Sequence, residues 1–84
     1  PRACFYKNVG YGGGSFCLAT GNSIGNLASA GWNDVISSVR LYGGASVQVC
    51  EHAGFGGACV TWNSNKSDLT ATGWNDIISS VDVF

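Results

Sequence analysis

The 84-residue sequence has little charge, one histidine, one proline and no methionine. Four basic residues against five acidic ones give a net charge of -1, which leaves no electrostatic footprint for nucleic acid and no polybasic membrane anchor. No apolar run approaches the ~18 residues of a spanning helix, so we expect no membrane insertion. One histidine and no Cys-x-x-Cys pair argue against a zinc or dithiol redox site.

Glycine and cysteine are the residues that this short chain has in excess. Thirteen glycines favour many tight turns over long helices. A chain of this size buries only roughly 60% of its unfolded surface, so cross-links help to stabilise it. An even number of cysteines in a short chain favours disulfides and therefore a secreted, extracellular protein. The four cysteines, which allow three connectivities, are Cys4, Cys17, Cys50 and Cys59.

An internal repeat divides the chain into two halves. Residues 31–39 (GWNDVISSV) return as residues 73–81 (GWNDIISSV), 42 positions later and with eight of nine positions identical. Near the front of each half the offset becomes 44, so we place two extra residues in the first half, within residues 14–16. Each half is too small to bury its own apolar face. We therefore predict a single domain over residues 1–84, built from two packed units, 1–43 and 44–84.

The local pattern within each unit is that of β-strands joined by hairpins. Residues 39–42 and 81–84 alternate, and glycine-rich stretches at 10–14 and 54–57 mark hairpins. Facing residues of a hairpin have a constant index sum. Cys4 and Cys17 centre between residues 10 and 11, and Cys50 and Cys59 centre between residues 54 and 55. The hairpins therefore predict the disulfides Cys4–Cys17 and Cys50–Cys59.

Two units, each with an aromatic–glycine hairpin followed by Trp-Asn-Asp-x-Ile-Ser-Ser, resemble the βγ-crystallin superfamily. The hairpin motifs are Tyr6…Tyr11-Gly12 and Cys50…Phe55-Gly56. The resemblance implies an all-β fold: a β-sandwich of two interlocked Greek-key motifs with about eight strands and little or no helix. It also implies that one strand of each key is exchanged into the other sheet. The length, the cysteines and the secreted character look most like the microbial killer-toxin-like branch.

The resemblance also implies calcium sites in the two Asn-Asp-x-x-Ser-Ser loops, since these loops bind calcium in other members. The implied ligands are Asn33, Asp34, the Val35 carbonyl, Ser37, Asn75, Asp76, the Ile77 carbonyl and Ser79. One carboxylate in each loop predicts weak sites, and the lengthened first hairpin makes the site that it completes the weaker candidate. We expect no required cofactor. In the alternative interpretation, the same side chains hold a tight loop without metal.

Two groups of side chains are candidates for chemistry and for binding. His52 beside Glu51 has no activated nucleophile with it, so we predict that the protein is not an enzyme. Trp62 has no repeat partner at the 42-residue offset, and it is predicted either to contact a target or to cover the edge of the core. The predicted contact surface would be extended by the three tyrosines, Tyr6, Tyr11 and Tyr42. The repeated tryptophans, Trp32 and Trp74, are expected in the core.

The leading functional hypothesis, which rests on the resemblance, is a secreted antifungal toxin. As a monomer it would bind a fungal cell-surface or cell-wall component, protein or glycan, and disturb the shape of yeasts and filamentous fungi. The first alternative is an inhibitor of a secreted metalloproteinase that acts as a rigid wedge with an exposed, strained loop. Further alternatives are a calcium-stabilised structural module and a lectin-like module.

Overall fold

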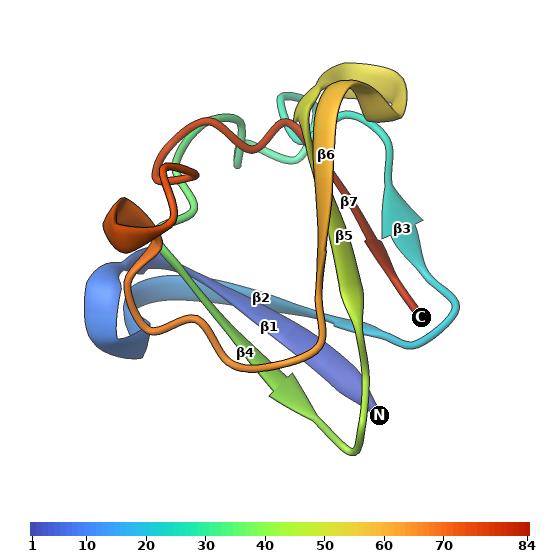
Figure 1. Cartoon of the computed structure of the whole chain (residues 1–84). Helices are drawn as coiled ribbons and strands as arrows, with labels where there is room; N and C mark the ends of the chain where they lie inside the picture. Colours follow the sequence, from blue (N-terminus) through green and yellow to red (C-terminus); the bar gives the residue numbers. More distant parts are fainter.

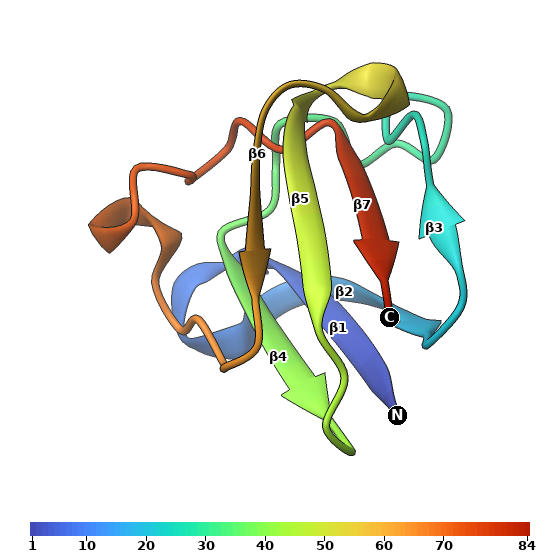
Figure 2. The ribbon, with the colours of Figure 1, turned by 45° about the vertical axis from the view of Figure 1, so that its right-hand side comes forward.

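The computed structural model describes all 84 residues and consists of two packed β-sheets (Figure 1). The first sheet has the order β2-β1-β4, with β1 (Arg2–Asn8), β2 (Gly12–Ala19) and β4 (Ser38–Tyr42). The second has the order β3-β7-β5-β6 (Figure 2), with β3 (Ser23–Ile24), β5 (Val47–His52), β6 (Gly56–Trp62) and β7 (Ser80–Val83). The only helical elements are three 3-10 turns, η1 (Val9–Tyr11), η2 (Ala53–Phe55) and η3 (Leu69–Ala71). The predicted all-β sandwich is confirmed.

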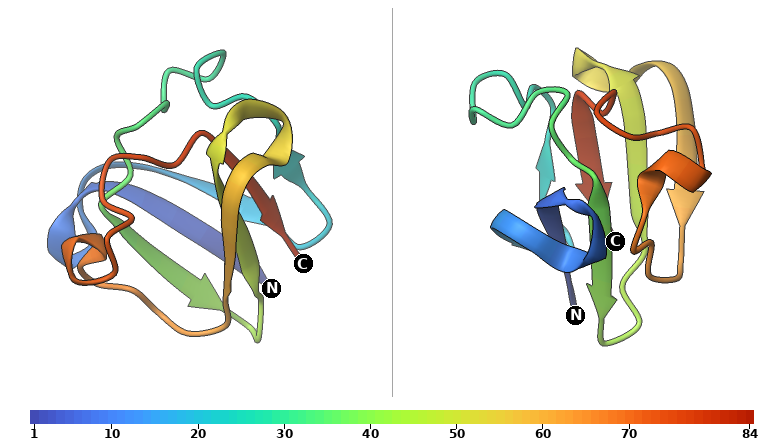
Figure 3. Two further views of the ribbon diagram at one scale, coloured as in Figure 1. Left: turned by 45° about the horizontal axis from the view of Figure 1, so that its top comes forward. Right: turned by 90° about the vertical axis from the view of Figure 1, so that its left-hand side faces the viewer.

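Each half of the chain contributes a segment to the sheet of the other half. β3 belongs to the first half but pairs with β7, where Ile24 lies opposite Val81 (Figure 3). The matching segment of the second half is reduced to one bridge, in which Lys66 and Val39 exchange backbone hydrogen bonds of 2.9 Å. The structure therefore has seven strands and one bridge in place of the predicted eighth strand, and its two keys are interlocked.

The core lies between the sheets and is formed by alternate residues of the strands. Its largest fully buried side chains include Phe5 in β1, and Leu27 and Leu69 in the repeated loops. Trp32 and Trp74 are half-buried and pack against this cluster, as their repetition predicted. Burying a side chain of this size stabilises the fold by about 1.5–3 kcal/mol relative to leaving it exposed.

The two hairpins have the same geometry, which contradicts the prediction that the first is longer. In the first, the register is interrupted before Asn8, which pairs with Gly12; in the second it is interrupted before His52, which pairs with Gly56. Each hairpin folds over a 3-10 turn in which the glycine and the following aromatic residue have left-handed backbone angles. Residues 14–16, in which the insertion was predicted, are therefore part of an ordinary strand, β2.

The two extra residues of the first half lie instead in the turn after β2. The 44-residue offset holds through β2 and β6, where Leu18 and Trp62 occupy equivalent positions that face the core. The 42-residue offset returns at β3, so the connection of residues 19–22 is two residues longer than that of residues 63–64. This longer turn reaches β7, where the Gly21 N–H donates to the Val83 carbonyl at 2.8 Å.

Two disulfides join the strand pairs, and they are the two that the hairpins predicted. Cys4–Cys17 links β1 to β2, and Cys50–Cys59 links β5 to β6. The two bonds do not occupy equivalent positions in the repeat, because by the 44-residue offset Cys50 corresponds to Tyr6. The second disulfide therefore lies closer to the tip of its hairpin than the first.

Candidate functional site

The two Asn-Asp-x-x-Ser-Ser loops contact each other across the boundary between the halves. The Ser37 Oγ donates to Oδ1 of Asp76 at 3.1 Å, and the Ser79 Oγ donates to Oδ1 of Asp34 at 3.2 Å. The backbone N–H groups of both aspartates also cross, each donating to a carbonyl of the opposite loop at 3.1 Å. Each aspartate–serine pair thus combines a carboxylate of one half with a hydroxyl of the other.

The backbone of these loops presents the carboxylates at the surface. Asp34 and Asp76 are exposed and have φ angles of 57° and 58°. Aspartate and asparagine tolerate this left-handed conformation better than most other residues. The repeated motif therefore places one exposed carboxylate in each loop beside a buried serine of the other loop.

The oxygens gathered at these loops fit a hard cation. Carboxylate, hydroxyl, amide and carbonyl oxygens are the ligands that Ca²⁺ prefers. Oδ1 of Asn75 is buried and has no hydrogen-bond partner, whereas the Asn33 amide donates to Asp34 at 3.2 Å. Val35 is half-buried and Ile77 is exposed. From the sequence, the candidate ligands were predicted as two groups, one in each loop. In the structure, the carboxylate of each loop pairs with the serine hydroxyl of the other loop.

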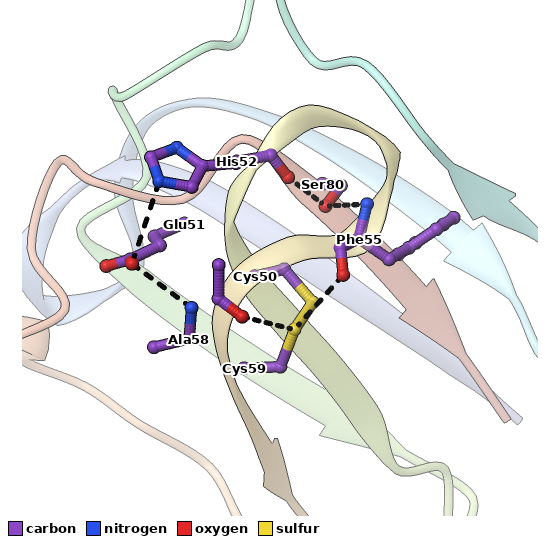
Figure 4. Close-up of a disulfide and its surroundings, with 8 residues drawn as sticks. Cys50, Glu51, His52, Phe55, Ala58, Cys59 and Ser80 are labelled. Atoms are coloured by element: carbon purple, nitrogen blue, oxygen red, sulfur yellow. Dashed lines mark hydrogen bonds and ion pairs between the residues drawn. A yellow bond between two sulfur atoms is a disulfide. The ribbon is translucent and has the colours of Figure 1, made fainter.

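The second serine of each Ser-Ser pair holds a hairpin in its folded form. The Ser80 Oγ donates to the His52 carbonyl at 2.8 Å and accepts a 3.2 Å hydrogen bond from the Phe55 N–H (Figure 4). Ser38 makes the same two hydrogen bonds in the first hairpin, at 2.6 and 3.1 Å. Both serines are fully buried. No role was predicted for these two serines from the sequence, although their exact repetition was a signal that could have identified one.

The second hairpin carries an aromatic side chain, Phe55, at its tip, and a disulfide and several hydrogen bonds cross the loop (Figure 4). The Cys50–Cys59 disulfide closes the loop, and the Ala58 N–H donates to Oε1 of Glu51 at 3.1 Å. At the tip, the Gly54 N–H donates to the Gly25 carbonyl at 2.6 Å. Phe55 has a φ angle of 61° and is 39% exposed. This is the exposed, strained loop that the inhibitor hypothesis requires.

The only histidine lies on this hairpin without catalytic partners. Nε2 of His52 is 3.7 Å from Oε1 of Glu51, and the His52 side chain is exposed. The serine that contacts His52, Ser80, donates to its backbone carbonyl and not to its ring. The structure has no pocket beside this histidine or elsewhere. None of its helical segments has the length and hydrophobicity needed to cross a bilayer.

The contact role predicted for Trp62 is wrong. Trp62 is 7% exposed and belongs to the buried core, where its ring meets that of Trp74 edge to face at 6.2 Å. It occupies the last inward-facing position of β6, equivalent to Leu18 in β2. The alternative interpretation, in which this tryptophan covers the core, describes its position.

The three tyrosines gather on the outer face of the first sheet. Tyr6 and Tyr11 meet edge to face, with ring centroids 5.6 Å apart, and all three side chains are half-buried. A hydrogen bond with the Tyr42 side chain, together with partial desolvation, raises the pKa of Tyr6 above its usual value. The three tyrosines therefore form a cluster, but Trp62 lies on the opposite sheet and is not part of it, and the contact role of the tyrosines stays a prediction.

Comparison with known proteins gives one family match and many similar structures. The profile of peptidase inhibitor family I36 matches residues 2–62. A βγ-crystallin domain from Flavobacterium johnsoniae is 37% identical, with a TM-score of 0.85 over 98% of this chain and 92% of that one. A double mutant of a βγ-crystallin domain from Clostridium beijerinckii is 30% identical, with a TM-score of 0.85 over 100% and 97% of the two chains. A βγ-crystallin from Ciona intestinalis is 26% identical, with a TM-score of 0.82 over 98% of each chain.

No curated protein matched the sequence significantly. None of the matches described above points to the killer-toxin-like branch of the superfamily. That part of the resemblance stays a prediction, whereas the similarity to βγ-crystallin domains extends over the whole chain.

Proposed function

Because the chain belongs to peptidase inhibitor family I36 and is built on the βγ-crystallin fold, we propose that it is a secreted inhibitor of an extracellular peptidase. The two disulfides support an oxidising, extracellular setting. The observation that carries the proposal is the tip of the second hairpin, where Phe55 is exposed on a loop closed by a disulfide.

A rigid loop is suited to inhibition because it loses little conformational entropy on binding. Three interactions restrain the hairpin: the disulfide, the hydrogen bonds of the Ser80 hydroxyl, and the hydrogen bond from the Gly54 N–H to the Gly25 carbonyl. Phe55 then presents a large apolar group, and a buried aromatic anchor in a pocket is typical of tight protein interfaces. The class of peptidase that fits is one with a hydrophobic specificity pocket, such as a thermolysin-type metallopeptidase.

The test is an inhibition assay with thermolysin and a fluorogenic peptide substrate. The wild-type chain is expected to inhibit, and the Phe55→Ala variant to raise the inhibition constant about tenfold or more. The matched control is Val9→Ala, which removes an apolar side chain that is 50% exposed on the other hairpin. Thermolysin activity that is unchanged by a large excess of the wild-type chain would exclude this peptidase class.

The antifungal toxin is the competing proposal. It rests on the resemblance of the sequence to the killer-toxin-like branch, whereas the inhibitor also has a family match behind it. Adding the purified chain to growing yeast separates the two proposals. Normal growth and normal cell shape at high dose, together with inhibition of a peptidase, would leave only the inhibitor.

We also propose that Ca²⁺ binds weakly at the two aspartate–serine pairs. The support is the convergence of oxygens from both halves, together with the unpartnered amide oxygen of Asn75. A cation there would join the two halves and would stabilise the folded state without taking part in inhibition.

A further inference from the structure

The outer face of the first sheet gathers every tyrosine and every arginine of the chain. The inward positions of its strands hold core residues such as Phe5 and Val39, so the alternate positions face outward. We call the set the tyrosine–arginine face; it consists of Arg2, Tyr6, Tyr11, Arg40 and Tyr42. This face is formed by residues that are up to 40 positions apart in the sequence and become neighbours only through strand pairing.

Both arginines are held against tyrosine rings and have no acidic partner. Cζ of Arg2 lies 4.3 Å from the centre of the Tyr42 ring, and Cζ of Arg40 lies 5.5 Å from the same centre. Arg40 is also 5.2 Å from the centre of the Tyr11 ring. The one ion pair of the chain joins Glu51 to a histidine, so both guanidinium groups keep their donors free. The rings position these groups before any partner arrives.

Charge is segregated over the molecule. The strands and the turn that form this face, β1, η1, β2 and β4, contain no acidic residue. The five acidic residues lie in the crossed loops, in the second sheet and next to η3; they are Asp34, Glu51, Asp68, Asp76 and Asp82. The face is therefore cationic on a chain whose net charge is -1.

We propose that the tyrosine–arginine face binds an acidic segment of a partner protein. Guanidinium groups pair with carboxylates through two parallel hydrogen bonds, which make the contact both strong and specific in its geometry. Tyrosine and arginine are among the residues that contribute most to protein–protein binding. The absence of a pocket on this face fits a macromolecular surface better than a small molecule.

The face is rigid and lies away from the proposed inhibitory loop. The Cys4–Cys17 disulfide links β1 to β2 at the edge of the face, and Cys4, which lies opposite Arg40, is only 3% exposed. In Figures 1 and 2 the first sheet lies at the bottom of the molecule, whereas the yellow turn η2 (Ala53–Phe55) lies at the top. The chain could therefore contact an acidic segment and a peptidase at the same time, so this inference goes beyond the proposed function.

The test uses a fluorescent ten-residue peptide of alternating glutamate and tyrosine, with binding followed by fluorescence anisotropy at low ionic strength. The wild-type chain is expected to bind saturably. The affinity of an Arg2→Gln/Arg40→Gln variant is expected to be lower by a factor of about ten or more. A Arg2→Lys/Arg40→Lys variant keeps the charge but loses the planar fork, so an intermediate affinity is expected. The matched control is Lys7→Gln/Lys66→Gln, which removes the same charge outside the face.

Three outcomes would overturn the proposal. The first is no saturable binding of the peptide, and the second is an equal loss of affinity in the lysine control, which would indicate net charge alone. The third is tighter binding of polygalacturonate than of the peptide, which would assign the face to an anionic glycan. Thermal unfolding of each variant checks that all of them are folded, and the exposed positions of both arginines make this the expected result.

Discussion

Ser79 and Ser80 are neighbours in the chain, yet their hydroxyl groups do different work. Ser79 donates to Asp34 in the opposite loop, while Ser80 bonds to two backbone groups of the second hairpin. The difference arises because Ser79 still belongs to the loop that precedes β7, whereas Ser80 is the first residue of that strand. At the scale of single residues, the motif therefore couples a surface oxygen cluster to the fold of a hairpin.

Replacing Ser80 with alanine should destabilise the protein by about 1–3 kcal/mol, because it removes two hydrogen bonds and leaves the Phe55 N–H without a partner. The free energy of unfolding is measured by urea denaturation. Ser64→Ala is the control, since Ser64 is exposed, and a change within about 0.5 kcal/mol is expected there. Equal stability of both variants would contradict the assigned role.

Tyr6 predicts how stability depends on alkaline pH. Its pKa is raised in the folded protein, so the folded state holds this proton more tightly than the unfolded chain does. The contribution of Tyr6 is fully present below the usual pKa of tyrosine and is lost as the pH rises through the raised pKa. Denaturation between pH 8 and pH 11 should show the loss in the wild-type chain and a smaller loss in Tyr6→Phe. Identical profiles would contradict the prediction.

At the scale of elements, the hairpins were predictable and their connections were not. Index sums place both disulfides, because facing residues of a hairpin depend only on local register. The extra residues were misplaced because Cys17 and Cys59 are 42 positions apart and were aligned with each other, although the strand register shows that they are not equivalent. Only the pairing of β3 with β7 shows that the longer segment is the turn of residues 19–22.

The two disulfides should differ in their effect on inhibition but not in their effect on stability. They span 13 and 9 residues, so the chain-entropy model gives each about 3 kcal/mol. Cys50→Ala/Cys59→Ala should also weaken inhibition of thermolysin, because it loosens the loop that carries Phe55. Cys4→Ala/Cys17→Ala is the control, and inhibition is compared at a temperature at which both variants are folded. Equal inhibition would place the inhibitory contact elsewhere.

At the scale of the whole molecule, the two halves are joined by exchange and not only by packing. β3, the bridge at Lys66 and the two aspartate–serine pairs all cross the boundary between the halves. A cation that bound the aspartate–serine pairs would stabilise the whole folded chain, because the oxygens of each pair come together only when both halves are folded.

Calcium is expected to raise the melting temperature of metal-stripped protein. Its dissociation constant is expected to be about 10⁻⁴–10⁻³ M, because each pair has only one carboxylate. Asp34→Asn/Asp76→Asn should abolish the increase while keeping acceptors for both serines. Calorimetric titration and thermal unfolding with and without Ca²⁺ measure both effects, with Mg²⁺ as the control ion. No heat and no change in melting temperature would remove the calcium proposal.

The sequence by itself determined the repeat, the β-strands, both disulfides and the motif loops, because all of these depend on local periodicity and on short-range spacing. Only the tertiary structure decided that Trp62 faces the core, that the aspartates and serines pair between loops, and that Arg2 and Arg40 share one face with the tyrosines. These features depend on the register between distant strands, where a shift of one residue would turn every side chain to the opposite face.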